Sequence, residues 1–243
     1  MRHFTLALFC AAGLAAGGEA LSGQQILDRV RDATTATDRR ARATMTITDR
    51  NARVQARSLR MVMKGNEKLL MTFESPADLK GVSFLSTSPE NMWIYLPAQG
   101  RVRRVAGAMA DQGLGGSDFS YSEMANISFA DQGKVEGLKD TIVAGKAAWV
   151  VATRDADGVV SRLAVDRDRF LPLEMTRLDR SGKPSKRVLF GDFVQSGESW
   201  VPRLVTVRDL ARGSRTELKL TDVKLNTGIK DNLFTEANLK KGA

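Results

Sequence analysis

The pattern of apolar and polar positions divides the chain into one helix followed by many strands. After Ser22, which can cap a first turn, Ile26, Leu27 and Val30 recur at helical spacing with charged residues between them. Beyond about Asp38 the apolar positions alternate every second residue, which is typical of strands with one buried face. This order predicts an amphipathic helix that leads into a sheet.

The alternating segments are separated by short polar turns. These turns include "KGNE", "DADG", "RSGKP" and "QSGES", whose residues reverse a chain readily. Two segments, "GVSFLST" and "NMWIYLP", are apolar on both faces, so we expect each side of the sheet to be covered there. The last strand changes phase around Asp222, which predicts a bulge or a strand end. The pattern predicts roughly ten or eleven antiparallel strands in one curved sheet, with one helical insertion.

A glycine-rich stretch, "GLGGSDFSYSEM", begins that insertion. It has no lysine for a phosphate loop, no βαβ context for a dinucleotide turn, and no histidine to activate a nucleophile elbow. Ser120 and Glu123 have the spacing of a capping box, and Ile127 continues the apolar positions. We interpret the stretch as a hinged lid, with a plain surface connection as the alternative. The residues assigned to the lid are Gly115, Gly116, Ser117, Asp118, Phe119, Tyr121 and Met124.

The first twenty residues, "MRHFTLALFCAAGLAAGGEA", have the features of a secretory signal peptide. A basic start precedes an apolar core and small residues, so we expect cleavage near Ala20 and a single mature domain over residues 21–243. Lipidation at Cys10 is the less favoured alternative, because Phe9 stands where a lipoprotein signal needs a small residue. The sequence therefore predicts an exported, periplasmic protein.

Removal of this leader also removes His3 and Cys10, the one histidine and the one cysteine of the chain. The mature chain then lacks the side chains for a Ser-His-Asp site, a disulfide or a His/Cys zinc site. We expect no catalytic residue, no metal and no cofactor, and therefore no enzyme. No second apolar run approaches the roughly 18 residues of a membrane span. The formal net charge of +9 favours anionic lipid head groups or an acidic protein over nucleic acid, with a solubilising surface as the alternative.

The run from Met71 to Met124 carries a family resemblance. Its segments "PADLKGVSFL", "WIYLPAQGRVRR" and "GSDFSYSEM" resemble the LolA-like outer-membrane lipoprotein-sorting proteins, and "NLFTEANL" is similar to that family's end. Ser122-Glu123-Met124 departs from the Glu-Asp-Leu expected there. The resemblance implies a mainly β LolA/LolB-like fold, an unclosed and strongly curved antiparallel β-barrel whose concave side is covered by helices. In that family the hollow holds acyl chains.

The resemblance makes the alternating apolar residues of the early strands candidates for a cavity lining. Methionine is unbranched and polarisable and suits a cavity for chains of varying shape, although core packing is the alternative for each residue. Trp93 and Tyr95 lie on one face of their strand, and the other face carries Met92, Ile94 and Leu96. Aromatic rings with a polar end suit the mouth of a cavity, so we expect Trp93 and Tyr95 to lie there. The predicted lining is Leu59, Met61, Met63, Leu69, Met71, Phe73, Phe84, Trp93 and Tyr95.

The motif "RVRR" predicts a basic rim. Arg101 and Arg103 share one strand face, and Arg104 lies on the other. Guanidinium groups there could hold a lipid phosphate or carboxylate, or fasten the lid through Asp118. The alternative is a solvated edge strand whose charges discourage aggregation.

Two functions are compatible with these features. The first is a periplasmic carrier that binds the acyl chains of a lipoprotein or lipid and passes them between membranes without covalent chemistry. The second is an envelope sensor of the same fold that detects lipids or lipoproteins and signals to a membrane partner. For the carrier we expect an inner-membrane exporter and an envelope acceptor as partners, transient membrane contact, a monomer, and no nucleic acid.

Overall fold

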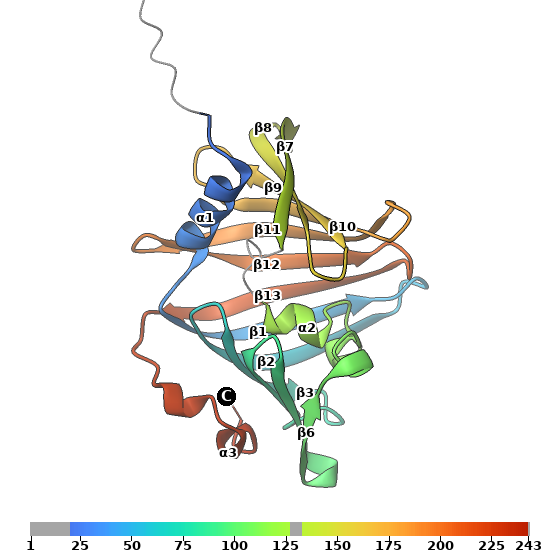
Figure 1. Cartoon of the computed structure of the whole chain (residues 1–243). Helices are drawn as coiled ribbons and strands as arrows, with labels where there is room; N and C mark the ends of the chain where they lie inside the picture. The colour runs from blue at the N-terminus through green and yellow to red at the C-terminus, as the bar shows by residue number, and fades with distance from the viewer. Residues whose placement is uncertain (1–19, 127–132, 243) are drawn as a thin grey trace, which may run out of the picture.

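The computed structural model describes residues 20–126 and 133–242, so residues 1–19 of the predicted leader and Ile127 lie outside the described residues. Within these ranges thirteen strands form one antiparallel sheet in the order β6-β5-β4-β3-β2-β1-β13-β12-β11-β10-β9-β8-β7 (Figure 1). The strands are β1 (Asp38–Thr48), β2 (Val54–Lys64), β3 (Lys68–Ser75), β4 (Ser83–Ser88), β5 (Asn91–Leu96), β6 (Arg101–Val105), β7 (Lys134–Val143), β8 (Lys146–Arg154), β9 (Val160–Asp166), β10 (Pro172–Leu178), β11 (Pro184–Ser196), β12 (Ser199–Asp209) and β13 (Ser214–Leu225).

The first and last strands of the chain, β1 and β13, lie side by side at the centre of the sheet. β1 pairs with both β2 and β13, while β6 and β7 are the two edges, so the sheet is not closed. β6 and β7 are consecutive in sequence, and the chain between them passes from one edge to the other. Its described part, residues 106–126, is called the crossing segment below. This arrangement confirms the predicted unclosed, mainly β fold.

Short helices complete the fold. They are α1 (Gly23–Thr34), α2 (Tyr121–Ala125) and α3 (Glu236–Leu239), with single 3-10 turns η1 (Pro97–Gln99), η2 (Gly107–Met109), η3 (Leu114–Gly116) and η4 (Asp231–Leu233). The sequence correctly predicted α1: Ser22 and Gln25 form a reciprocal capping box, and Ile26, Leu27 and Val30 are buried. Among the described residues, none of these helices is long and apolar enough to cross a membrane.

The pairing of the strands confirms the predicted bulge and corrects the strand number. The β1–β13 register shifts between Arg40 and Arg42, opposite the position where Asp222 has φ +51°. The expected ten or eleven strands were too few, because the hairpin of β7 and β8 was not recognised. Most of β7 is exposed or half-buried, so its side chains lack the clear alternation of a strand with one buried face.

Two apolar clusters lie on opposite faces of the sheet. The sheet has two halves, the first formed by β1 to β6 and the second by β7 to β13. The inner core, on the concave face, joins α1, the crossing segment and both halves. An outer cluster on β2, β3 and β4 packs under the chain that follows β13; its buried members are Val62, Leu70, Leu85, Ile229, Phe234 and Leu239. Strand β4, predicted to be apolar on both faces, is therefore covered on both sides: Phe84 belongs to the inner core and Leu85 to the outer cluster.

Asp38 holds the start of this C-terminal cover. Its carboxylate accepts hydrogen bonds from the backbone N–H of Thr227 at 2.7 Å, of Gly228 at 2.8 Å and of Ile229 at 3.0 Å. Burial opposes ionisation of Asp38, but these hydrogen bonds outweigh it and lower the pKa of the carboxyl group. The first strand thereby fixes the path of the chain after the last strand.

Candidate functional site

The predicted cavity residues gather on the concave face, with two exceptions. Strand alternation on β2, β3 and β4 turns them inward, and all are buried in the inner core. The members that lie there are Leu59, Met61, Met63, Leu69, Met71, Phe73 and Phe84. Their assembly on one face agrees with the alternation read from the sequence, while their contact with a ligand stays a prediction.

Trp93 and Tyr95 are the exceptions, and the structure corrects their assignment. Both pack against the outer cluster beside Leu233, whereas Met92 and Ile94 of the same strand face the inner core. The sequence could not decide between the faces because β5 is apolar on both. The outer face needs apolar residues because the C-terminal chain covers it.

The crossing segment covers part of the concave face. Leu114, Phe119, Tyr121 and Met124 are buried in the inner core. The rings of Tyr121 and Phe84 lie 5.4 Å apart between centroids, a separation typical of favourable aromatic contact. The segment is therefore packed against the sheet rather than held away from it (Figure 1).

The glycines of this segment serve close packing as well as turning. Gly115 has φ +58°, and a Cβ placed there would lie 2.7 Å from Cζ of Phe73. Gly116 has φ +79° but open space around its Cα. At Gly115 the backbone therefore rests directly on an aromatic ring, while the role of both glycines as a pliable hinge stays a prediction.

Asp118 anchors the crossing segment to the other half of the sheet. Its side chain is fully buried and accepts hydrogen bonds from Oγ of Ser214 at 2.5 Å and Oγ1 of Thr216 at 2.8 Å. Thr216 Oγ1 in turn accepts from the Asp118 backbone N–H at 2.9 Å, and Arg212 lies 3.1 Å from the carboxylate. Lys186 donates to the Asp118 carbonyl at 2.9 Å. We call these contacts the Asp118 anchor.

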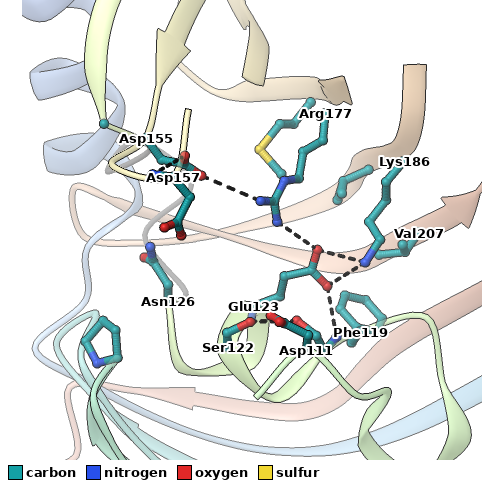
Figure 2. Close-up of a pocket in the computed structure, with 15 residues that line it drawn as sticks. Asp111, Phe119, Ser122, Glu123, Asn126, Asp155, Asp157, Arg177, Lys186 and Val207 are labelled. Carbon is teal, nitrogen blue, oxygen red and sulfur yellow. Dashed lines mark hydrogen bonds and ion pairs between the residues drawn. The ribbon is translucent and has the colours of Figure 1, made fainter. Parts of the chain in front are cut away.

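Glu123 provides a second polar attachment, shown in Figure 2. Its carboxylate caps α2 by accepting from the backbone N–H of Ser120, and it lies 2.8 Å from Nζ of Lys186 and 3.5 Å from Arg177. Arg177 also approaches Asp155, at 3.7 Å. This network borders a polar pocket of about 490 Å³ that also contacts Phe119. The sequence pattern predicts Glu123 only as a helix cap and does not indicate Lys186, which lies 63 residues later in the chain.

The predicted rim arginines do not hold the lid. Arg101, Arg103 and Arg104 are exposed on the edge strand β6, and Arg104 donates to the carbonyl of Glu90 at 3.2 Å. The cation beside Asp118 is Arg212, from the turn between β12 and β13. The structure therefore corrects the expected pairing of this rim with Asp118 and agrees with a solvated edge strand.

A small apolar cavity of about 80 Å³ lies between the two halves of the sheet. Its walls include Met61 and Met63 of β2 and Met124 of α2, together with residues that sequence reasoning did not select: Thr34, Arg39, Asn66, Glu123, Pro172, Val201, Pro202, Val205, Leu218 and Leu220. Alternation in β12 and β13 could have indicated the inward valines and leucines, but not their proximity to β2.

No group of three or more His, Cys, Asp or Glu side chains in the described ranges is placed to hold a metal ion.

Arg39 is the cation that borders the apolar cavity, and burial lowers its pKa to about 10. The guanidinium group is therefore charged at neutral pH.

Comparison with known proteins agrees with this architecture. A DUF1329 family protein from Desulfovibrio piger is 22% identical, with a TM-score of 0.82 over 89% of this chain and 97% of that one. A domain described as outer membrane lipoprotein-sorting, from Vibrio parahaemolyticus, is 23% identical, with a TM-score of 0.81 over 90% and 98%. A LolA superfamily protein from Nitrosomonas europaea is 17% identical, with a TM-score of 0.75 over 90% and 99%.

A family model described as that of an uncharacterized protein matches residues 65–241. The chain belongs to that family, and its fold is similar to that of the LolA superfamily protein. This confirms the resemblance found in the sequence. No curated protein matches the LolA-like chain.

Proposed function

We propose that this LolA-like protein binds the acyl chains of a lipid or lipoprotein in its concave hollow and carries them across the periplasm without covalent chemistry. The observation that carries the proposal is the apolar cavity between the two halves of the sheet. Flexible methionine side chains, Met61, Met63 and Met124, form part of its wall, and such side chains adapt to ligands of varying shape.

Binding a full acyl chain requires the hollow to enlarge. The cavity of about 80 Å³ is well below the roughly 300–1,000 Å³ of typical ligand pockets. The crossing segment occupies the adjoining space, and its withdrawal would uncover the inner faces of Phe73 and Phe84. In the proposed cycle an acyl chain replaces the apolar contacts of this segment, so the open and closed states differ by only a few kcal/mol.

A cavity-filling variant tests the proposal. Val205 lines the cavity and is 7% exposed, so Val205→Phe should occupy the space and weaken binding of a fluorescent fatty-acid probe at least fivefold. Val54→Phe is the matched control, because Val54 is 65% exposed on β2. If neither fluorescent fatty acids nor lipids extracted from the host bind the unmodified protein with micromolar affinity, the proposal is wrong.

Transfer distinguishes a carrier from the envelope sensor considered above. A carrier should release its loaded probe to acceptor vesicles, whereas a sensor should retain it until a protein partner is added. Native mass spectrometry of protein purified from its own host would identify a co-purified lipid. Fractionation in the same experiment would test export, with a mature, unacylated mass expected in the periplasm.

A further inference from the structure

We propose that Arg39 is the head-group site of this cavity, and that the preferred ligand is an alkyl chain ending in an oxyanion, either a carboxylate or a phosphate monoester. The inference rests on the proposed function, because it adds a head-group preference to the acyl chain assigned to the hollow. It changes the expected ligand from any acylated molecule to an acidic amphiphile.

The position of Arg39 is unusual for a charged residue. It is 7% exposed and lies at the start of β1, directly opposite Met63 of β2. Strand alternation turns Arg39 to the concave face, while its neighbour Arg40 is exposed on the other face. A cation is seldom buried to this extent unless it has a charged partner.

Arg39 has no such partner in the described part of the chain. Its Nε is buried without a hydrogen bond, and one terminal nitrogen donates only to the neutral Asn66 Oδ1, at 3.2 Å. The adjacent carboxylate of Asp38 is directed to the backbone of residues 227–229. Glu123, the acidic residue of the cavity lining, lies 2.8 Å from Lys186. The nearby carboxylates are thus committed elsewhere, and the guanidinium group is left with an unused donor.

The cavity supplies both parts of an amphiphile site. Arg39, Asn66 and Thr34 form a polar end, and the methionines, valines and leucines of β2, β12 and β13 form the apolar body. Guanidinium groups bind carboxylates and phosphates through paired N–H donors, and low local polarity strengthens such contacts. An oxyanion at this end would supply the missing acceptor for Nε while its alkyl chain followed the apolar wall.

The test measures binding of palmitate, hexadecyl phosphate and methyl palmitate by displacement of a neutral fluorescent alkyl probe. The unmodified protein should bind at least one of the two acids tenfold or more tightly than the ester, and the stronger acid identifies the head group. Arg39→Met should abolish that preference and leave ester binding within twofold. Arg40→Met is the matched control and should behave like the unmodified protein, and Arg39→Lys should retain part of the preference.

Each outcome has a definite meaning. If the unmodified protein binds the acids and the ester equally, or if folded Arg39→Met keeps the preference, the Arg39 site is wrong and the carrier proposal survives. If none of the three ligands nor the neutral probe binds, the proposed function itself fails. Thermal unfolding establishes that Arg39→Met is folded; should it not fold, the acid-to-ester ratio of the unmodified protein and of Arg39→Lys decides the question.

Discussion

Removal of the Asp118 carboxylate should release the crossing segment before the sheet unfolds. Asp118→Ala deletes the acceptor of two buried hydroxyl groups, those of Ser214 and Thr216. Hydrogen bonds to a charged group contribute about 1.5–3 kcal/mol each, and the ion pair with the half-exposed Arg212 adds at most about 1 kcal/mol. Because these contributions are not additive, we expect a net loss of about 3 kcal/mol.

The assay is hydrogen exchange of peptides from the crossing segment. A loss of about 3 kcal/mol corresponds to an opening equilibrium on the order of 100-fold larger, and exchange in residues 113–126 should accelerate by that factor. Exchange in the centre of β13 should change much less, because the packing of the sheet is retained. Asp118→Asn keeps the shape and part of the hydrogen bonding, so its effect should be smaller, and Asp111→Ala replaces an exposed acid of the same segment as a control.

Thr216→Val addresses the same contact from the opposite strand. Thr216 both donates to the Asp118 carboxylate and accepts from its backbone N–H, so the two substitutions should be strongly coupled in a double-mutant cycle. The reasoning would be refuted if Asp118→Ala left exchange in the segment unchanged. It would also be refuted if the segment and β13 accelerated together, since the segment would then open only with the whole fold.

Three further predictions concern the glycines and Asp38. Gly115→Ala should lower the free energy of unfolding by about 2–4 kcal/mol, because the new methyl group meets Phe73 and the backbone has positive φ. Gly116→Ala should lower it by only about 1 kcal/mol, because φ is positive there but no atom lies near the new methyl group. Urea unfolding measures both. Asp38→Ala should cost about 2–3 kcal/mol by the same measurement, because the buried N–H of Ile229 and the part-buried N–H groups of Thr227 and Gly228 lose a charged acceptor. An unchanged midpoint would contradict this. The pKa of Asp38 is lowered from 3.8, so its carboxylate stabilises the folded state above that pH, and this contribution is lost as the pH falls further. The fall in the free energy of unfolding below about pH 4 should therefore be shallower in Asp38→Asn than in the unmodified protein.

The sequence predicted what depends on local pattern and missed what depends on pairing across the fold. Alternation identified the inward residues of β2 and β3, and the capping residues Ser22 and Ser120 identified the starts of α1 and α2. Pattern could not choose a face for Trp93 and Tyr95, because each face of β5 is apolar and the choice depends on the distant C-terminal cover. It also could not find the partners of Asp118, which lie almost a hundred residues later in the chain.

The polar anchors of the crossing segment and its contacts with Phe73 and Phe84 lie on different halves of the sheet, and this division indicates how the hollow opens in the proposed cycle. Its aromatic and glycine contacts rest on Phe73 and Phe84 of the first half, whereas its polar contacts reach Lys186 and Thr216 of the second. Apolar contacts are non-directional and weaken gradually as surfaces slide, while short hydrogen bonds are lost over a small displacement. Movement of the crossing segment away from the second half would therefore break the hydrogen bonds of the polar anchors abruptly. The apolar contacts with the first half would continue to hold the segment. An acyl chain that enters beside β12 and β13 would meet these hydrogen bonds first, so the strength of the Asp118 anchor should set the rate of loading more than the affinity of the loaded state.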